Sequence, residues 1–243
     1  MLVTTEAIIL RTRKQGDTSK IITIFSLDYG KINLIAKGVR KSSKKAQTFL
    51  EPTTHAFFSF YKKNNSDLFL LTKSDPITIF GKIFESYELM TNALTILESV
   101  IICFHNDAPN ETLFQLLLES IKILNEKCNF PQSLLVAYQL KFAELLGFNF
   151  QLENIICNEI DDYYISLEYG TVCKGRNSGF KNFFSIDYKI LLKFKNIFDN
   201  SLNSANLINL SDLEKNQIQN LFSLYFSFHL EQKFVLNTLK LMK

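Results

Sequence analysis

Residues 20–37 read KIITIFSLDYGKINLIAK, two runs rich in β-branched and apolar residues joined by a turn that contains Gly30. Glycine adopts positive φ readily, as such turns require. In the second run Ile32, Leu34 and Ala36 fall on one face, because side chains alternate along a strand. This stretch therefore predicts a pair of strands with one buried face.

Further strands are predicted on both sides of this pair, at residues 6–10, 55–62 and 67–73. In the fourth strand the apolar residues Ala56, Phe58 and Phe60 share a face. The pair Asp75-Pro76 is expected to end the fifth strand. Five short strands in about 75 residues favour a small barrel, for which the OB-fold is the common five-stranded solution. We expect residues 1–80 to form an OB-fold domain.

From about residue 80 the hydrophobic period changes from 2 to 3.6, which is typical of helices. The apolar stripes run over residues 90–104, 113–124, 131–146, 186–198 and from 213 to the end. Gly147 stands where a left-handed cap would end the third helix. Residues 149–184 have no helical period and read as an irregular insert. The predicted fold class is therefore α+β, an amino-terminal barrel followed by a helical domain over residues 81–243.

Charge is unevenly distributed between these two regions. Residues 1–80 hold 13 Lys or Arg against 6 Asp or Glu, a net charge of +7, and the remaining residues have a net charge of −4. A basic domain next to a mildly acidic one is typical of a module that binds a polyanion.

Ten cations between residues 11 and 45 are the candidate nucleic-acid contacts. They are Arg11, Arg13, Lys14, Lys20, Lys31, Lys37, Arg40, Lys41, Lys44 and Lys45. Clustered cations meet neighbouring phosphates and release counterions, which gives binding without sequence preference. The alternative is a solvated basic loop with no partner. Three aromatic residues nearby, Tyr29, Phe57 and Tyr61, are candidates for base stacking, although each also fits a place in the core.

Residues for catalysis or for metal binding are sparse. The sequence has no Walker loop, GxGxxG or GxSxG motif, and its three histidines are not spaced as a metal pair. Cys157 and Cys173 flank the insert, but a zinc ribbon needs a CxxC at both ends, and Asn154 and Arg176 stand at the other two positions. We expect no enzyme activity, no cofactor and no zinc. The start lacks the pattern of a secretory signal and no apolar run is long enough to span a membrane, so we expect a cytoplasmic protein.

Several motifs, in order along nearly the whole chain, resemble the RecO family of bacterial recombination and DNA repair mediators. They are EAIILR (6–11), GDTSKIITIFS (16–26), YGK (29–31), AKGVRK (36–41), LEP (50–52), LLGF (145–148), HL (229–230) and LKL (239–241). Each is weak by itself, and their order and spacing make the resemblance specific.

The resemblance implies an amino-terminal OB-fold and a helical domain with an inserted four-cysteine zinc module, which only Cys157 and Cys173 match here. It also implies binding of single- and double-stranded DNA, annealing of complementary strands, and help in loading a recombinase. The partners it implies are RecR and the acidic tail of the single-stranded DNA-binding protein. A helical protein adaptor, whose barrel binds no nucleic acid, is the competing hypothesis, and an uncharacterised enzyme is a third.

Overall fold

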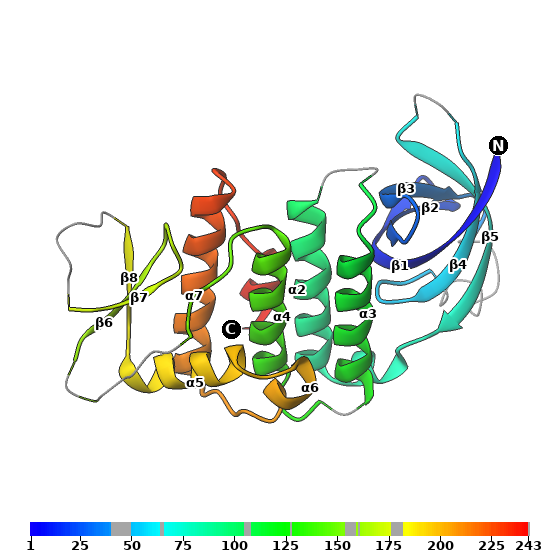
Figure 1. Cartoon of the computed structure of the whole chain (residues 1–243). Helices are drawn as coiled ribbons and strands as arrows, with labels where there is room; N and C mark the ends of the chain where they lie inside the picture. The colour runs from blue at the N-terminus through cyan, green and yellow to red at the C-terminus, as the bar shows by residue number, and fades with distance from the viewer. Residues whose placement is uncertain are drawn as a thin grey trace. The chain divides into compact units, whose positions relative to one another are not determined.

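The computed structural model describes residues 1–39, 50–63, 66–104, 108–126, 128–153, 159, 161–175 and 182–242. The chain forms two compact units, one of Met1–Asn125 with Thr238–Lys243 and one of Glu126–Asn237. The first contains a β-barrel and two long helices, and the second contains further helices and a small sheet (Figure 1). The predicted domain boundary at residue 80 falls just after the last barrel strand.

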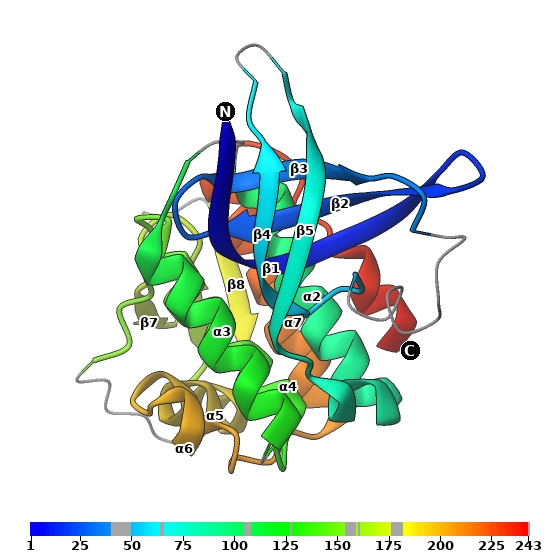
Figure 2. The same ribbon diagram turned by 90° about the vertical axis from the view of Figure 1, so that its right-hand side faces the viewer.

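Five strands form a closed barrel in the first unit (Figure 2). They are β1 (Leu2–Gln15), β2 (Ser19–Ser26), β3 (Gly30–Ala36), β4 (His55–Tyr61) and β5 (Leu68–Thr78). Their order is β1-β2-β3-β5-β4, and neighbours are antiparallel except β3 and β5, which are parallel. A five-stranded barrel of this kind is the architecture of an OB-fold. The predicted fold of the amino-terminal region is confirmed.

Alternating side chains fill the barrel. The inward-facing residues predicted for β3 and β4 are all buried in its core: Ile32, Leu34, Ala36, Ala56, Phe58 and Phe60. The ring of Phe60 also stacks on Phe69 of β5, with 5.5 Å between ring centroids. Burying a large apolar side chain contributes about 1.5–3 kcal/mol, so this core is the main source of the barrel's stability.

The first strand is longer than the sequence pattern predicts, because it runs over Leu2–Gln15 rather than residues 6–10. Its register against β2 shifts between Ile9 and Arg11, which makes Leu10 the extra residue of a β-bulge. The bulge interrupts the alternation of side chains. The period that identifies a strand is therefore lost at this point of the sequence.

The prediction that Asp75-Pro76 ends the fifth strand is wrong, because β5 continues to Thr78. Pro76 pairs with Ala56 of β4. Among the described residues, β3 pairs with β5 only as far as Leu70, so beyond that point β5 is an edge strand on one side. Proline is tolerated on an edge because no neighbour needs its missing N–H.

Gly30 begins β3 and has a φ of 64°, as the turn in the sequence predicted. The position is also crowded. A Cβ atom there would lie 2.4 Å from the backbone carbonyl of Ala108. Both the conformation and the close approach of a second backbone segment therefore require glycine.

A 3₁₀ turn and two long helices follow the barrel in the first unit. They are η1 (Gly81–Glu85), α2 (Tyr87–Cys103) and α3 (Glu111–Glu126), and the turn η2 (Asn237–Met242) lies at the end of the chain. The stripe predicted for α3, Leu113, Leu117, Ile121 and Leu124, is buried. Phe104, directly after α2, meets Phe25 of β2 edge-on at 6.1 Å, so the end of α2 packs against the barrel wall.

The second unit begins with α4 (Pro131–Leu145), which Gly147 follows with a φ of 87°, as predicted for its cap. The other helices are α5 (Tyr188–Phe198), α6 (Leu202–Ala205) and α7 (Asp212–His229). Gln139 of α4 and Gln219 of α7 are both buried, and each side-chain amide donates to the other at 2.9 Å.

The expectation of an irregular insert needs correction. Its described part holds a three-stranded antiparallel sheet of order β7-β6-β8, with β6 (Tyr163–Ser166), β7 (Val172–Lys174) and β8 (Phe183–Ile186). Strands of three or four residues are too short to show a period of two in the sequence. The last helix is shorter than its prediction, which ran from residue 213 to the end of the chain, because α7 ends at His229. Leu224 and Phe228 on this helix are exposed.

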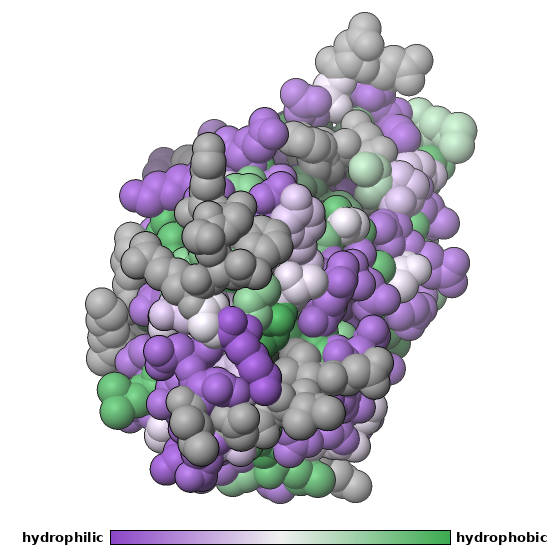
Figure 3. Space-filling model, turned by 60° about the vertical axis from the view of Figure 1, so that its left-hand side comes forward, coloured by the Kyte–Doolittle hydropathy of each residue, from purple (hydrophilic) through white to green (hydrophobic). Residues whose placement is uncertain are grey.

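Figure 3 shows one face of the molecule, on which hydrophilic side chains predominate and hydrophobic ones form small separate areas. Within the described residues, no helix combines the length and the apolar character that crossing a bilayer requires.

Candidate nucleic-acid interface

The strand register brings several of the predicted cations to one end of the barrel. Lys14 of β1 lies opposite Lys20 of β2, and Lys20 lies opposite Ala36 of β3. Lys37 is the next residue after Ala36 and is exposed. Three consecutive strands thus bring these cations to the end of the sheet where β1 ends, β2 begins and β3 ends.

Arg11 and Arg13 extend this group along β1. Both are exposed, with half-buried Thr12 between them, so their side chains lie on the same side of the strand. Arg11 lies opposite Thr23 and Arg13 opposite Ile21, both on β2. Both side chains therefore leave the outer wall of the barrel, from backbone positions about 7 Å apart along the strand. We call the exposed residues Arg11, Arg13, Lys14 and Lys37 the basic track.

Lys20 has a protein partner for its charge. Its side chain is buried, and its Nζ lies 2.7 Å from Oε1 of Glu51, with which it forms an ion pair. The side chain of Glu51 is 45% exposed, so only the lysine end of the pair is buried, and losing Glu51 would leave that buried ammonium without its partner. The ammonium of Lys20 is thus engaged in holding the segment around Glu51 to β2.

Lys31 is likewise engaged within the fold. Its Nζ donates to the carbonyl oxygen of Ile101, 2.8 Å away, in the last turn of α2. Burial lowers the pKa of Lys31 below its ordinary value of 10.5, and the nearby charge of Arg11 lowers it further. Burial also raises the pKa of the adjacent thiol of Cys103 to about 12. Lys31 is therefore half-buried at the end of α2 and engaged within the fold.

Four of the predicted contacts, Arg40, Lys41, Lys44 and Lys45, lie outside the described residues. The residues on either side of them are anchored near the basic track. Thr12 donates its hydroxyl to the carbonyl of Leu50 at 2.8 Å, and Glu51 binds Lys20. The chain therefore leaves the barrel at Lys37 and returns at Leu50 beside the same end of β1 and β2.

The three aromatic candidates have different surroundings. Phe57 and Tyr61 alternate with core residues of β4 and are 44% and 46% exposed. Tyr29 is half-buried, and the Nζ of Lys62 lies 4.3 Å from the centroid of its ring. Lys62 and its neighbour Lys63 were not among the predicted contacts. The available signal was the position of two adjacent cations just before the turn between β4 and β5.

Within its described residues the insert offers little for metal binding. Cys157, Asn154 and Arg176 lie outside the described residues, and Cys173 is a free thiol on β7. Over the part of the chain that the structure describes, no group of three or more His, Cys, Asp or Glu is arranged to hold a metal ion. Asp161, one of the adjacent acids in the insert, forms an ion pair with Lys174 at 3.2 Å.

Two family profiles match this chain. The one described as Recombination protein O N terminal matches residues 1–80, and the one described as Recombination protein O C terminal matches residues 85–236. The DNA repair protein RecO of Thermoanaerobacter sp. strain X514 is 27% identical, over 96% of this chain and 94% of its own. The DNA repair protein RecO of Bacillus velezensis is 27% identical, over 100% of this chain and 97% of its own. That of Bacillus subtilis strain 168 is 30% identical, over 71% of this chain and 68% of its own.

Proposed function

This chain belongs to the RecO family of DNA repair proteins, and we propose that it is a recombination mediator that binds DNA and anneals complementary strands. In this proposal it also assists loading of the recombinase during recombinational repair. The observation that carries the proposal is the strand register, which brings the exposed cations of β1 and Lys37, directly after β3, to the same part of an OB-fold barrel. OB-folds commonly bind oligonucleotides on this kind of surface.

The physical basis of annealing is electrostatic. Two complementary strands repel each other through their phosphates, and cations that replace condensed counterions reduce this repulsion. Base pairing then supplies the driving force. Arg11 and Arg13 hold phosphates on the barrel wall, and Lys14 and Lys37 extend the contact toward residues 40–45. Because no bond is made or broken, we propose that the protein is not an enzyme and needs no cofactor.

Lys20 and Lys31 have a different role in this account. Their ammonium groups bind Glu51 and the Ile101 carbonyl, so they hold the wall in place and contribute little to phosphate binding. The basic track of Arg11, Arg13, Lys14 and Lys37, with the four cations of residues 40–45, is the proposed DNA surface.

The proposed partners are single- and double-stranded DNA, RecR, and the acidic tail of the single-stranded DNA-binding protein. Membership of the family supports all of them, and the basic barrel supports partners that carry negative charge. We propose that the protein acts in the cytoplasm, where the chromosome of a bacterium lies, and that Cys157 and Cys173 are remnants of a zinc module that no longer binds metal.

An annealing assay tests this proposal. Two complementary oligonucleotides, each with a fluorophore, are mixed with the purified protein in the absence of ATP, and energy transfer reports duplex formation. We expect the protein to accelerate annealing and the variant Arg11→Gln/Arg13→Gln to lose most of the acceleration. Equal acceleration by the wild type and this variant would contradict the assignment of the basic track.

A second candidate function is a protein adaptor whose helical region docks a partner. It is favoured by Leu224 and Phe228, one turn apart on α7 and 49% and 38% exposed, since exposed apolar side chains on one helix face are a feature of docking sites. The two functions differ in their response to salt. DNA affinity that declines steeply with salt supports the mediator, whereas absence of DNA binding at any salt supports the adaptor.

A further inference from the structure

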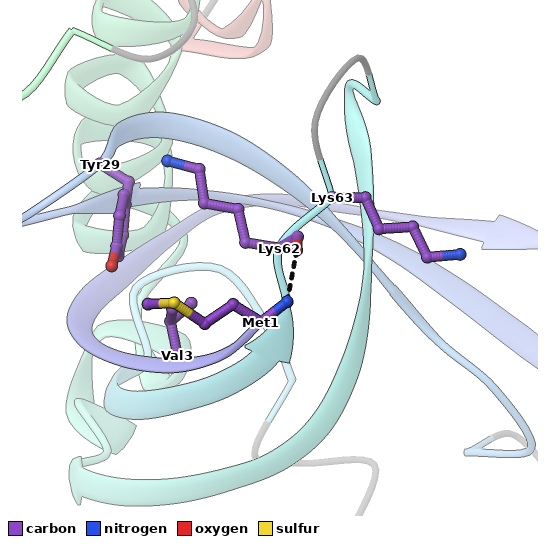
Figure 4. Close-up of a pocket in the computed structure, with 5 residues that line it drawn as sticks. All are labelled: Met1, Val3, Tyr29, Lys62 and Lys63. Atoms are coloured by element: carbon purple, nitrogen blue, oxygen red, sulfur yellow. Dashed lines mark hydrogen bonds between the residues drawn. The ribbon is translucent and has the colours of Figure 1, made fainter.

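A pocket of about 550 Å³ opens at the barrel surface away from the basic track. Its lining comes from the start of β1 (Met1 and Val3), from the turn between β2 and β3 (Tyr29) and from the loop after β4 (Lys62 and Lys63). Figure 4 shows Lys62 extending toward Tyr29, whereas the side chain of Lys63 points the opposite way.

The contacts within this pocket fix an aromatic ring and a cation relative to each other. The ring of Tyr29 meets Phe60 of the core edge-on, with 5.8 Å between centroids. The backbone nitrogen of Met1 donates to the carbonyl oxygen of Lys62 at 3.0 Å, which holds the backbone at the base of that side chain (Figure 4). From there the Nζ of Lys62 reaches over the Tyr29 ring, 4.3 Å from its centroid.

We infer that this pocket binds one nucleotide of a single strand, with the phosphate on Lys62 and the base against the ring of Tyr29. The inference rests on the proposed function and adds a site to it. A nucleotide joins a flat base to an anion, and the pocket presents a ring and a cation at the same point. Its volume lies within the range of about 300–1,000 Å³ that is usual for small-molecule sites.

Binding of a nucleotide replaces the contact between Lys62 and the Tyr29 ring with two contacts, one from Lys62 to the phosphate and one from the ring to the base. In the free protein Lys62 lies over the half-buried ring of Tyr29, and a cation–π contact that is still partly in solvent is weak. A phosphate gives the ammonium a full negative charge to bind, and the ring face that the ammonium leaves becomes available to the base. Stacking of a base on an aromatic ring is the stronger of the two ring contacts.

The pocket and the basic track lie at opposite ends of β2. Arg13 is opposite Ile21 near the start of that strand, and Tyr29 follows its end. Tyr29 is eight positions after Ile21 in the chain, which is at most about 26 Å when extended. One OB-fold covers about 4–16 nucleotides, so a strand at the long end of this range reaches both sites and a short one reaches only the track.

The test compares Lys62→Gln with Lys63→Gln, two neighbours whose replacement changes the net charge equally. Affinities are measured at low salt for fluorescent oligothymidylates of about 4 and about 16 nucleotides, the two ends of that range. We expect Lys62→Gln to weaken binding of the longer strand by about five- to tenfold and that of the shorter by less than about twofold. Lys63→Gln weakens both by less than about twofold, and Lys62→Arg restores the wild-type value.

A second measurement places the base directly. The longer strand is synthesised with 5-iodouracil, irradiated on the protein and mapped by mass spectrometry, and we expect a crosslink at Tyr29. The pocket would be overturned if Lys62→Gln and Lys63→Gln lost the same affinity for the long oligonucleotide and no crosslink formed at Tyr29. The proposed function would remain intact in that case, provided that DNA still bound through Arg11 and Arg13. The proposal would also be overturned if Lys62→Gln weakened binding of an acidic peptide but left binding of the long oligonucleotide unchanged. Failure of the wild type to bind either oligonucleotide would overturn the proposed function itself.

Discussion

The Nζ of Lys31, on β3 of the barrel, donates to the carbonyl oxygen of Ile101, in the last turn of α2, at 2.8 Å. The last four carbonyls of a helix have no partner within it, and the C-terminal end of the helix dipole favours a cation. Lys31 provides both the donor and the charge. A residue within the basic segment is thus used to attach a helix to the barrel.

Replacing Lys31 with Met is expected to lower the free energy of unfolding by about 1 kcal/mol, since the loss of the hydrogen bond outweighs relief from burying the charge. Urea denaturation measures the change. The matched variant Lys37→Met, at an exposed position, should alter stability by less than about 0.5 kcal/mol and should weaken DNA binding. A loss of DNA affinity in Lys31→Met as large as in Arg13→Gln would place Lys31 in the interface.

Cys103 is expected to react slowly with alkylating reagents. Burial raises its pKa from 9.0 to about 12, and only the thiolate is nucleophilic, so its reactive fraction at pH 8 falls about a thousandfold. Mass spectrometry after iodoacetamide treatment of the native and the urea-unfolded chain measures the rates. Labelling of Cys103 at the same rate in both states would show that the thiol is not buried.

The same pKa predicts a dependence of stability on pH. Between pH 9 and 12 the unfolded chain releases the proton of Cys103 while the folded chain retains it, so the folded state binds more protons and loses stability as pH rises. Lys31 has the opposite effect, because its lowered pKa makes the folded state release its proton first. The variant Cys103→Ala should therefore lose less stability than the wild type between pH 9 and 10. Equal losses of stability in the wild type and Cys103→Ala over this pH range would argue against the raised pKa of Cys103.

Gly30→Ala should be strongly destabilising, by at least about 2 kcal/mol, because it adds a clash to an unfavourable conformation. Gly16→Ala is the matched control. Gly16 also has a positive φ, 56°, but a Cβ there would meet nothing within 4 Å. Gly16→Ala should therefore lower the free energy of unfolding only by the conformational cost of about 1–2 kcal/mol. Thermal unfolding of both variants measures the difference, and equal costs would mean that Ala108 moves away.

The buried amide pair of Gln139 and Gln219 should show non-additive substitutions. Either single change to Leu leaves one buried amide without its partner, and it should lower stability by about 1–3 kcal/mol. The double change removes both polar groups and should be less destabilising than the sum of the two. Additive losses in urea denaturation would mean that the two amides do not depend on each other.

The sequence predicted the barrel because its strands alternate cleanly over lengths that fix the period, as in residues 30–36. It missed features that depend on short segments or distant contacts. The bulge at Leu10 removed the alternation from β1, and the three strands of the insert are too short to show one. Lys20 and Lys31 look the same as Arg11 and Arg13 in a count of cations. Only the fold shows that Glu51 and the Ile101 carbonyl, far away in the sequence, bind their charges.

The most direct test of the account is the salt dependence of single-stranded DNA affinity. The wild type is compared with the fourfold variant Arg11→Gln/Arg13→Gln/Lys14→Gln/Lys37→Gln and with a control that changes four exposed lysines elsewhere, Lys82, Lys122, Lys189 and Lys233, to Gln. Each phosphate contact contributes about 0.7 to the slope of log affinity against log salt. We predict that the magnitude of this slope falls by about 3 in the track variant and hardly changes in the control. Equal slopes in all three proteins would contradict the claim that the barrel's basic track holds the DNA backbone.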